Sequence, residues 1–191
     1  MPKGQKKIFL GFTVKQAFIN ALNLYFEEIK LQLAEYPIRF IAPANYHLTL
    51  KYMGWTDDAK VRSLMEKLQT FICPQVLITP IYYSWLGKFS PRALTLEFSH
   101  TSLIGLVKKC NQHFIKEGIY IEPDGLRPHL TFARHKGKIS IVRQLALENI
   151  VEHLPCLKQE LLLDRLILYE SVMREGQVTY EKLCVQPLQI G

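Results

Sequence analysis

The sequence lacks any apolar run of the length, about 20 residues, that a membrane-spanning helix needs. The short apolar stretch at residues 8–14 is too brief and too poorly flanked to be a signal peptide. Glycine and proline are few, with ten of each, and no segment has low complexity. These absences exclude collagen-like and disordered chains, and we expect a cytoplasmic protein that does not contact a membrane.

Cysteine is also scarce and widely spaced. The four cysteines are at positions 73, 110, 156 and 184, and no two of them form a C-x-x-C pair. This spacing argues against a zinc ribbon or a thioredoxin-type motif and is typical of buried, reduced thiols. The histidines outside the motif described below have no acidic neighbours at metal-site spacing. We therefore predict no metal ion and no other cofactor.

The charge balance is moderately basic. Lys and Arg together number 24 against 17 for Asp and Glu, which gives a formal net charge of +7. This excess favours a partner that carries phosphate or other negative charge, although solubility alone also accounts for it. With 191 residues, of which 48% are hydrophobic, the chain can form a sizeable core. No long linker divides it, so we expect a single domain over residues 1–191.

Apolar periodicity predicts alternating strands and helices and hence an α+β fold. Strands are expected at residues 6–12, 46–53, 76–86, 93–98, 129–134, 161–169 and 180–185. Helices are expected at residues 14–33, 101–116 and 140–151, with a further helix capped by Thr56 that ends before Pro74. Residues 87–92 contain the Gly and Pro of a hairpin loop.

One tetrapeptide pattern occurs twice, nearly half the chain apart. Residues 47–50 read His-Leu-Thr-Leu and residues 129–132 read His-Leu-Thr-Phe. Both lie in expected strands, where alternate side chains share a face, so each strand presents an imidazole beside a hydroxyl. A single His-x-Thr carries little information, because both residues are ordinary in strands and a half-buried histidine is usually just hydrogen-bonded. Two such strings in comparable contexts are far more specific.

The elements around the two strings follow a similar order, with a helix after each string and a β-hairpin beyond it. We expect two pseudo-symmetric lobes, with antiparallel sheets that line a central cleft and helices packed outside. Two imidazoles that face each other across a cleft suit phosphodiester cleavage, since one can accept a proton while the other donates one. His47 and His129 are the predicted catalytic residues, and the hydroxyls of Thr49 and Thr131 would hold phosphate oxygens, with cross-strand packing as the alternative role.

With their flanks, residues 46–54 and 127–134, the two strings resemble the signatures of the two-histidine phosphoesterase superfamily. Within it the chain is most similar to the bacterial and archaeal RNA 2′,3′-cyclic phosphodiesterases, historically called 2′-5′ RNA ligases. The strand at residues 8–12, the hairpin at 87–89, and residues 168–171 with Tyr180 also resemble pieces of that family. Thr95 departs from the pattern, because the family often has Trp at that position.

The resemblance implies metal-free hydrolysis of a 2′,3′-cyclic phosphate at an RNA 3′ end to a 2′-phosphate, and some members also join or cleave 2′-5′ linkages. By analogy His47 would protonate the leaving 3′ oxygen and His129 would activate water, with the opposite assignment also open. Arg134 matches a family arginine that would clamp the phosphate. Strict alternation from His129 points Arg134 away, so Arg134 must lie past the strand end or on a bulge.

Lys51 and Arg127 are weaker candidates for binding the phosphate, and the alternative for each is a solvated basic residue near the cleft. Aromatic residues that could stack on a terminal base are Phe12, Tyr52, Tyr82 and Phe89. The expected partners are RNA 3′ ends or oligonucleotides with a 2′,3′-cyclic phosphate, and we expect a monomer. Two alternatives stay open: a non-catalytic RNA-binding module that retains the cleft, and a 2′-5′ ligase or phosphodiesterase that uses the same site.

Overall fold

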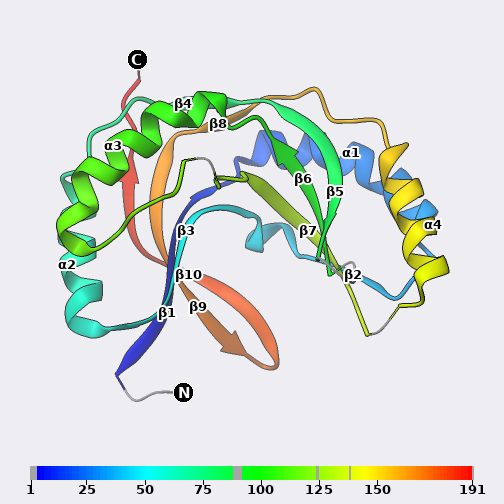
Figure 1. Ribbon diagram of the computed structural model, residues 1–191, viewed down its shortest axis with the longest axis horizontal. Helices are drawn as coiled ribbons and strands as arrows, with labels where there is room; N and C mark the ends of the chain where they lie inside the picture. Colours follow the sequence, from blue (N-terminus) through cyan, green and yellow to red (C-terminus); the bar gives the residue numbers. More distant parts are fainter. Residues whose placement is uncertain (1–3, 88–91, 124, 138, 191) are drawn as a thin grey trace.

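The computed structural model describes residues 4–87, 92–123, 125–137 and 139–190 (Figure 1). The first half of the chain forms β1 (Gln5–Thr13), α1 (Gln16–Gln32), β2 (Ile38–Phe40), β3 (His47–Asp57), α2 (Asp58–Gln69), β4 (Val76–Ile78) and β5 (Pro80–Leu86). The second half forms β6 (Ala93–Phe98), α3 (Ile104–Phe114), β7 (His129–His135), α4 (Ile141–Glu152), β8 (Leu161–Leu163), β9 (Arg165–Arg174) and β10 (Gln177–Pro187).

The order of elements repeats. The series β1, α1, β3, α2, β4, β5 is followed by the equivalent series β6, α3, β7, α4, β8, β9, which leaves β2 and β10 outside the repeat. The main sheet has the order β10-β9-β1-β3-β7-β6-β5, with β2 paired to β7 and every neighbouring pair antiparallel. The two lobes meet where β3 pairs with β7 through Leu48 and Leu130. The expected two-lobed α+β fold is confirmed.

Helices cover the outside of both lobes, and two of them cross from one lobe to the other. α2 packs against β1, β3 and β10, and α4 packs against β5. α1 follows β1 but covers the opposite lobe, where its Phe26 stacks on Phe132 of β7 with ring centroids 4.7 Å apart. α3 follows β6 and lies beside α2 at the other end of the molecule, where Phe114 packs on Phe71 (Figure 1).

Several element boundaries differ from the expectation. β3 extends to Asp57, and the carboxylate of Asp57, not Thr56, caps α2 by accepting from the Lys60 backbone N–H at 2.8 Å. The expected strand at 76–86 divides into β4 and β5, because β4 leaves the main sheet to pair with β8. The expected strand at 161–169 divides into β8 and β9 for the same reason. β2 has only three residues, too few for a periodic signal.

One apolar core runs through both lobes, and its largest fully buried side chains include Phe12, Phe71, Phe114 and Phe132. Because this core and the main sheet are shared, we propose that the lobes form one domain. All four cysteines are free thiols and three of them are buried, as the spacing indicated. Among the helices of the described ranges, none is both long and apolar enough to cross a membrane.

Candidate active site

The two His-x-Thr strings meet at the centre of the sheet. Extending the antiparallel register of the Leu48–Leu130 pair places His47 beside Thr131 and Thr49 beside His129. The leucines are buried, and all four polar side chains line one cavity of about 290 Å³ on the other face of the sheet. The structure therefore brings the predicted histidines and threonines together around a local two-fold axis.

Both imidazole rings are fixed in the same way. The Nδ1 atom of His47 lies 2.8 Å from the carbonyl oxygen of Asn45, and that of His129 lies 2.8 Å from the carbonyl oxygen of Arg127. Because a carbonyl oxygen can only accept, each Nδ1 must carry the hydrogen. Each Nε2 is then left for proton transfer, as a lone pair in the neutral ring or an N–H in the imidazolium.

A β-bulge turns Arg134 toward the same cavity. Two successive residues of β6, at positions 94 and 95, pair with Ala133 and Thr131, so Phe132 is an extra residue in β7. Phe132 and Ala133 are both buried, and the next residue, Arg134, lines the cavity with the histidines. The bulge shifts the alternation of side chains by one residue. Arg134 therefore faces the cavity, although strict alternation from His129 would point it away.

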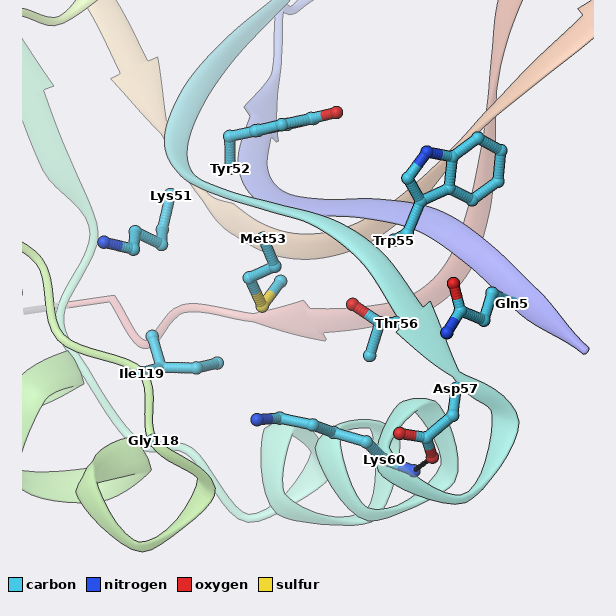
Figure 2. Close-up of a pocket in the computed structure, with 10 residues that line it drawn as sticks. All are labelled: Gln5, Lys51, Tyr52, Met53, Trp55, Thr56, Asp57, Lys60, Gly118 and Ile119. Atoms are coloured by element: carbon cyan, nitrogen blue, oxygen red, sulfur yellow. Dashed lines mark hydrogen bonds between the residues drawn. The ribbon is translucent and has the colours of Figure 1, made fainter. Parts of the chain in front are cut away.

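β3 contains an equivalent bulge at Leu50, where residues 10 and 11 of β1 pair with Lys51 and Thr49. Tyr52 thus takes the position of Arg134 and lines the two-histidine cavity. Lys51 projects from the other side of β3, as Figure 2 shows, and lines a separate cavity of about 420 Å³. Of the weaker candidates, Lys51 therefore lies outside the two-histidine cavity.

Close approach of β1 to the β3 bulge requires glycine at position 11. A Cβ atom on Gly11 would lie 2.4 Å from the carbonyl oxygen of Leu48, which is far inside contact distance. Since that oxygen belongs to the backbone of the first string, it cannot move without displacing His47 and Thr49. The corresponding position of the other lobe holds Thr95, opposite Thr131, so only one lobe has this tight contact.

His47 lies among aromatic rings. Its ring centroid is 4.4 Å from that of Tyr180 and 4.9 Å from that of Phe9, and Tyr169 follows at 6.1 Å. Phe9 and Tyr169 also stack on each other, with centroids 4.9 Å apart. This group forms a small apolar cluster on the cavity side of the sheet, separate from the main core.

The surroundings of His47 favour its neutral form. Burial lowers the pKa of His47 because it removes water from the charged ring. The hydrogen bond to Asn45 raises the pKa in part, while the positive charges of His129 and Arg134 lower it again. The net shift is downward from 6.5, so the resting ring holds a lone pair on Nε2 at neutral pH.

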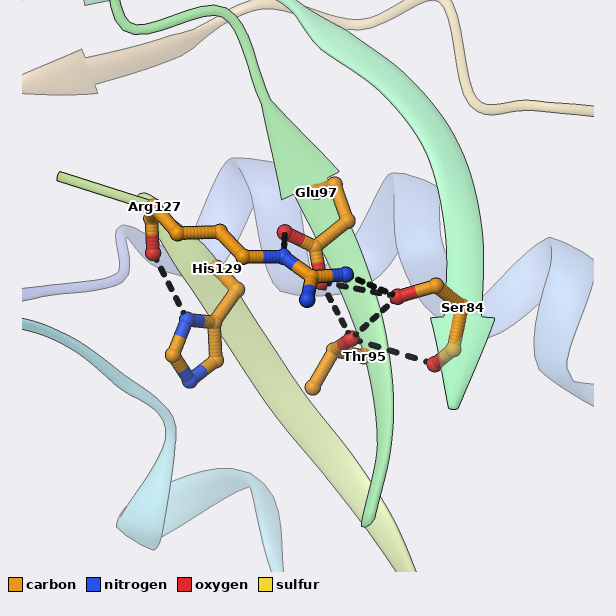
Figure 3. Close-up of polar contacts among 5 residues, drawn as sticks. All are labelled: Ser84, Thr95, Glu97, Arg127 and His129. Atoms are coloured by element: carbon orange, nitrogen blue, oxygen red, sulfur yellow. Dashed lines mark hydrogen bonds and ion pairs between the residues drawn. The ribbon is translucent and has the colours of Figure 1, made fainter. Parts of the chain in front are cut away.

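His129 lies beside a polar network instead (Figure 3). Arg127 donates from Nε to Glu97 Oε2 at 2.8 Å and from Nη2 to Ser84 Oγ at 2.9 Å. Thr95 donates to Glu97 Oε1 at 2.6 Å, and the Glu97 residue is only 2% exposed. The network holds Arg127, whose carbonyl oxygen accepts from His129. Arg127 therefore supports the site without lining its cavity.

Sequence reasoning missed several residues that line the two-histidine cavity, namely Lys7, Ile41, Asn45 and Val178, and it included Phe9 and Ser171 only as part of the resemblance. Tyr180, noted only as part of the resemblance, also lines it. Among the aromatic candidates only Tyr52 is placed there. Phe12 is buried in the main core, so that prediction is wrong, and Tyr82 is not part of this cavity. Phe89 lies outside the described residues.

Across the described ranges, no three His, Cys, Asp or Glu side chains are grouped where they could hold a metal ion. Metal independence stays a prediction that activity measurements in a chelator can test.

Comparison with known proteins finds one family model that matches part of the chain. The family model described as LigT-like phosphoesterase matches residues 13–76, which contain the first string. Among curated proteins, none matches the sequence significantly.

Solved structures match almost the whole chain. Escherichia coli LigT complexed with 3′-AMP has a TM-score of 0.68 at 16% identity, over 96% of this chain and 98% of that one. TT0787 of Thermus thermophilus has a TM-score of 0.70 at 15% identity, over 96% and 98%. Usb1 of Kluyveromyces marxianus has a TM-score of 0.55 at 13% identity, over 95% and 99%.

The fold and the paired His-x-Thr strings are similar to those of the two-histidine phosphoesterases. At these identities the solved structures establish the fold, and the family model adds the match over the first string. The family model and the shared LigT fold support the resemblance drawn from the two strings: over residues 13–76 the chain is similar to the LigT-like phosphoesterases.

Proposed function

We propose that this protein hydrolyses RNA 2′,3′-cyclic phosphate ends to 2′-phosphates without a metal ion. The observation that carries the proposal is the pair of imidazoles, His47 and His129, which line one cavity with each Nδ1 bound to a carbonyl oxygen and neither Nε2 hydrogen-bonded to a described residue. Escherichia coli LigT, a protein of the same fold, has been solved with 3′-AMP and with phosphate. A ribose phosphate end is a ligand of the same chemistry.

In the proposed reaction a water oxygen bonds to phosphorus while the bond from phosphorus to the 3′ oxygen breaks. One imidazole takes a proton from the water, and the other gives its proton to the 3′ oxygen. The product carries a 2′-phosphate and a 3′-hydroxyl, and the two rings have exchanged protonation states. Thr49, Thr131 and Arg134 would bind the phosphate oxygens, where negative charge grows in the transition state.

We assign the base to His47 and the acid to His129, the reverse of the assignment by analogy. A general base must begin neutral, and burial among aromatic rings favours neutral His47. His129 lies in the polar half of the site, opposite Glu97 in the β6–β7 register, and is the remaining ring for the acid role.

The proposal is tested by incubating purified protein in EDTA with a short RNA that ends in a 2′,3′-cyclic phosphate. We expect the wild type to form a 2′-phosphate, and His47→Ala and His129→Ala to be about 10²- to 10⁴-fold slower. His100→Ala serves as the control, because His100 is exposed and does not line the cavity. RNA binding without turnover would contradict the proposal and favour the alternative of a non-catalytic RNA-binding module.

Two further assays distinguish the remaining hypotheses. Activity that EDTA abolishes and a divalent metal restores would contradict metal-free chemistry. Addition of a second RNA with a free 5′-hydroxyl would reveal ligase activity as a longer product with a 2′-5′ linkage.

A further inference from the structure

The two strands outside the repeat, β2 and β10, build a second cavity beside the active site. It has a volume of about 580 Å³, and we call it the Arg39 cavity after the residue that distinguishes it. Its remaining lining consists of Phe40, Ala42, Gln177 and five residues shared with the two-histidine cavity. The shared residues are Ile41, Asn45, Arg134, Val178 and Tyr180. The two cavities therefore adjoin along one wall.

Two arginine residues lie on neighbouring strands at this boundary. Arg39 of β2 lies directly opposite Arg134 of β7 in the antiparallel register. Both residues are exposed, and neither is ion-paired with a carboxylate of the described chain. Like charges directly opposite each other on neighbouring strands destabilise a sheet. An anionic ligand that lies across both side chains would remove that repulsion.

The order of groups across the two cavities matches the order of groups along an RNA end. Arg134 borders both cavities and is proposed to hold the phosphate at the histidines. Arg39 lies one strand further from β3, a spacing of about 4.8 Å at the backbone. In RNA the next negative charge is the phosphodiester on the 5′ side of the terminal nucleotide. The amides of Asn45 and Gln177 supply hydrogen-bonding groups for the ribose and base.

We propose that the Arg39 cavity binds the nucleotide that precedes the cyclic end, with Arg39 on its phosphodiester. The substrate is then an RNA chain, and a lone nucleoside 2′,3′-cyclic phosphate is a poor substitute. This inference rests on the proposed function, because it takes the scissile phosphate to lie between His47 and His129.

The cavity on the other side of β3 fits an RNA strand less well. It is also basic, with Lys51 and Lys60, but it contains the carboxylate of Asp57 (Figure 2). Its only residue in common with the two-histidine cavity is Tyr52. It is therefore the competing RNA-binding site that the experiment tests.

The test compares adenosine 2′,3′-cyclic phosphate with an adenylate dinucleotide that ends in the same cyclic phosphate. We expect the wild type to prefer the dinucleotide, and Arg39→Gln to lower kcat/KM for the dinucleotide at least tenfold, as for loss of a charged hydrogen bond. The mononucleotide should be turned over within about twofold of the wild-type rate, because it does not reach Arg39. Arg62→Gln, which removes an exposed arginine of α2, is the matched control and should change neither value.

A binding measurement keeps the test independent of turnover. A labelled dinucleotide with a 2′-phosphate end is titrated at several salt concentrations with wild type and Arg39→Gln. Loss of one phosphate contact should reduce the slope of log K against log salt by about 0.7. Thermal unfolding of both proteins shows that the variant is folded.

The outcomes that overturn the inference differ from those that overturn the proposed function. Absence of a dinucleotide preference in the wild type, or equal loss on both substrates in Arg39→Gln, would refute the Arg39 cavity. So would a selective dinucleotide defect in Lys60→Gln instead. If the wild type cleaves neither substrate, the proposed function fails, and equal dinucleotide binding by wild type and Arg39→Gln would then also refute the RNA site.

Discussion

The two lobes present the same His-x-Thr string in opposite surroundings. In both, the imidazole is held by the carbonyl oxygen two residues earlier and a bulge follows at the fourth residue. His47 then packs among Phe9 and Tyr180, whereas His129 lies beside the ion pair of Glu97 and Arg127. The repeated backbone fixes where the rings stand, and burial on the aromatic side of the site lowers the pKa of His47.

Loss of either imidazole ring should have the largest effect on catalytic activity. The double variant His47→Ala/His129→Ala should be little slower than either single variant, because the proposed mechanism uses the two rings as a unit in one proton exchange. Single-turnover rates on a cyclic-phosphate RNA measure this. Losses that multiply across the two sites would show that the rings act independently.

Glu97→Gln tests the polar half of the site. The substitution keeps the shape of the side chain but leaves the Arg127 guanidinium without its charged partner. We expect about 1–3 kcal/mol of lost stability, less than for a fully buried pair because Arg127 is half exposed. Urea unfolding measures the stability.

Activity measurements on Glu97→Gln distinguish a role in positioning His129 from an effect on stability alone. At temperatures where Glu97→Gln is fully folded, kcat should fall, because the Arg127 carbonyl no longer holds His129 firmly, while KM for a mononucleotide changes little. Glu152→Gln, at the exposed last residue of α4, is the control. An unchanged kcat would limit Glu97 to a structural role.

Gly11→Ala probes the tight contact that only the His47 lobe contains. The added methyl group would force the Leu48 carbonyl away, at a cost of about 1–3 kcal/mol for overpacking. The equivalent change in the other lobe, Thr95→Ala, introduces no clash but removes the hydroxyl bonded to Glu97. Thermal unfolding of both variants, with kcat on the same RNA, distinguishes backbone displacement from a lost hydrogen bond.

The smallest expected effect is a shift in the pH dependence of kcat/KM. Burial lowers the pKa of His47, so the acid limb of kcat/KM should lie below pH 6.5 if His47 is the base. Tyr180→Ala admits water to the ring, which weakens that effect and should move the limb upward, toward 6.5, by less than about one unit. A limb that stays in place in Tyr180→Ala would argue that another group controls it.

Much of the site could be predicted because its signals are local. The two strings, their strands and the need for a bulge before Arg134 all follow from alternation along a single strand. The partners of each histidine do not, since Glu97 reaches His129 through strand pairing and Tyr180 reaches His47 from the end of the chain. The proposed acid and base roles rest on these distant neighbours, which explains why the sequence left them open.

The exchange of α1 and α3 between lobes has a consequence for folding. Each lobe is covered by one helix that comes from the other half of the chain, as the contacts of Phe26 with Phe132 and of Phe114 with Phe71 show. If the chain were cut between β5 and β6, each fragment would lack part of its own cover and expose apolar surface. The fragments could regain the native fold only by associating with each other. The distance between His47 and His129 therefore depends on the two halves folding together.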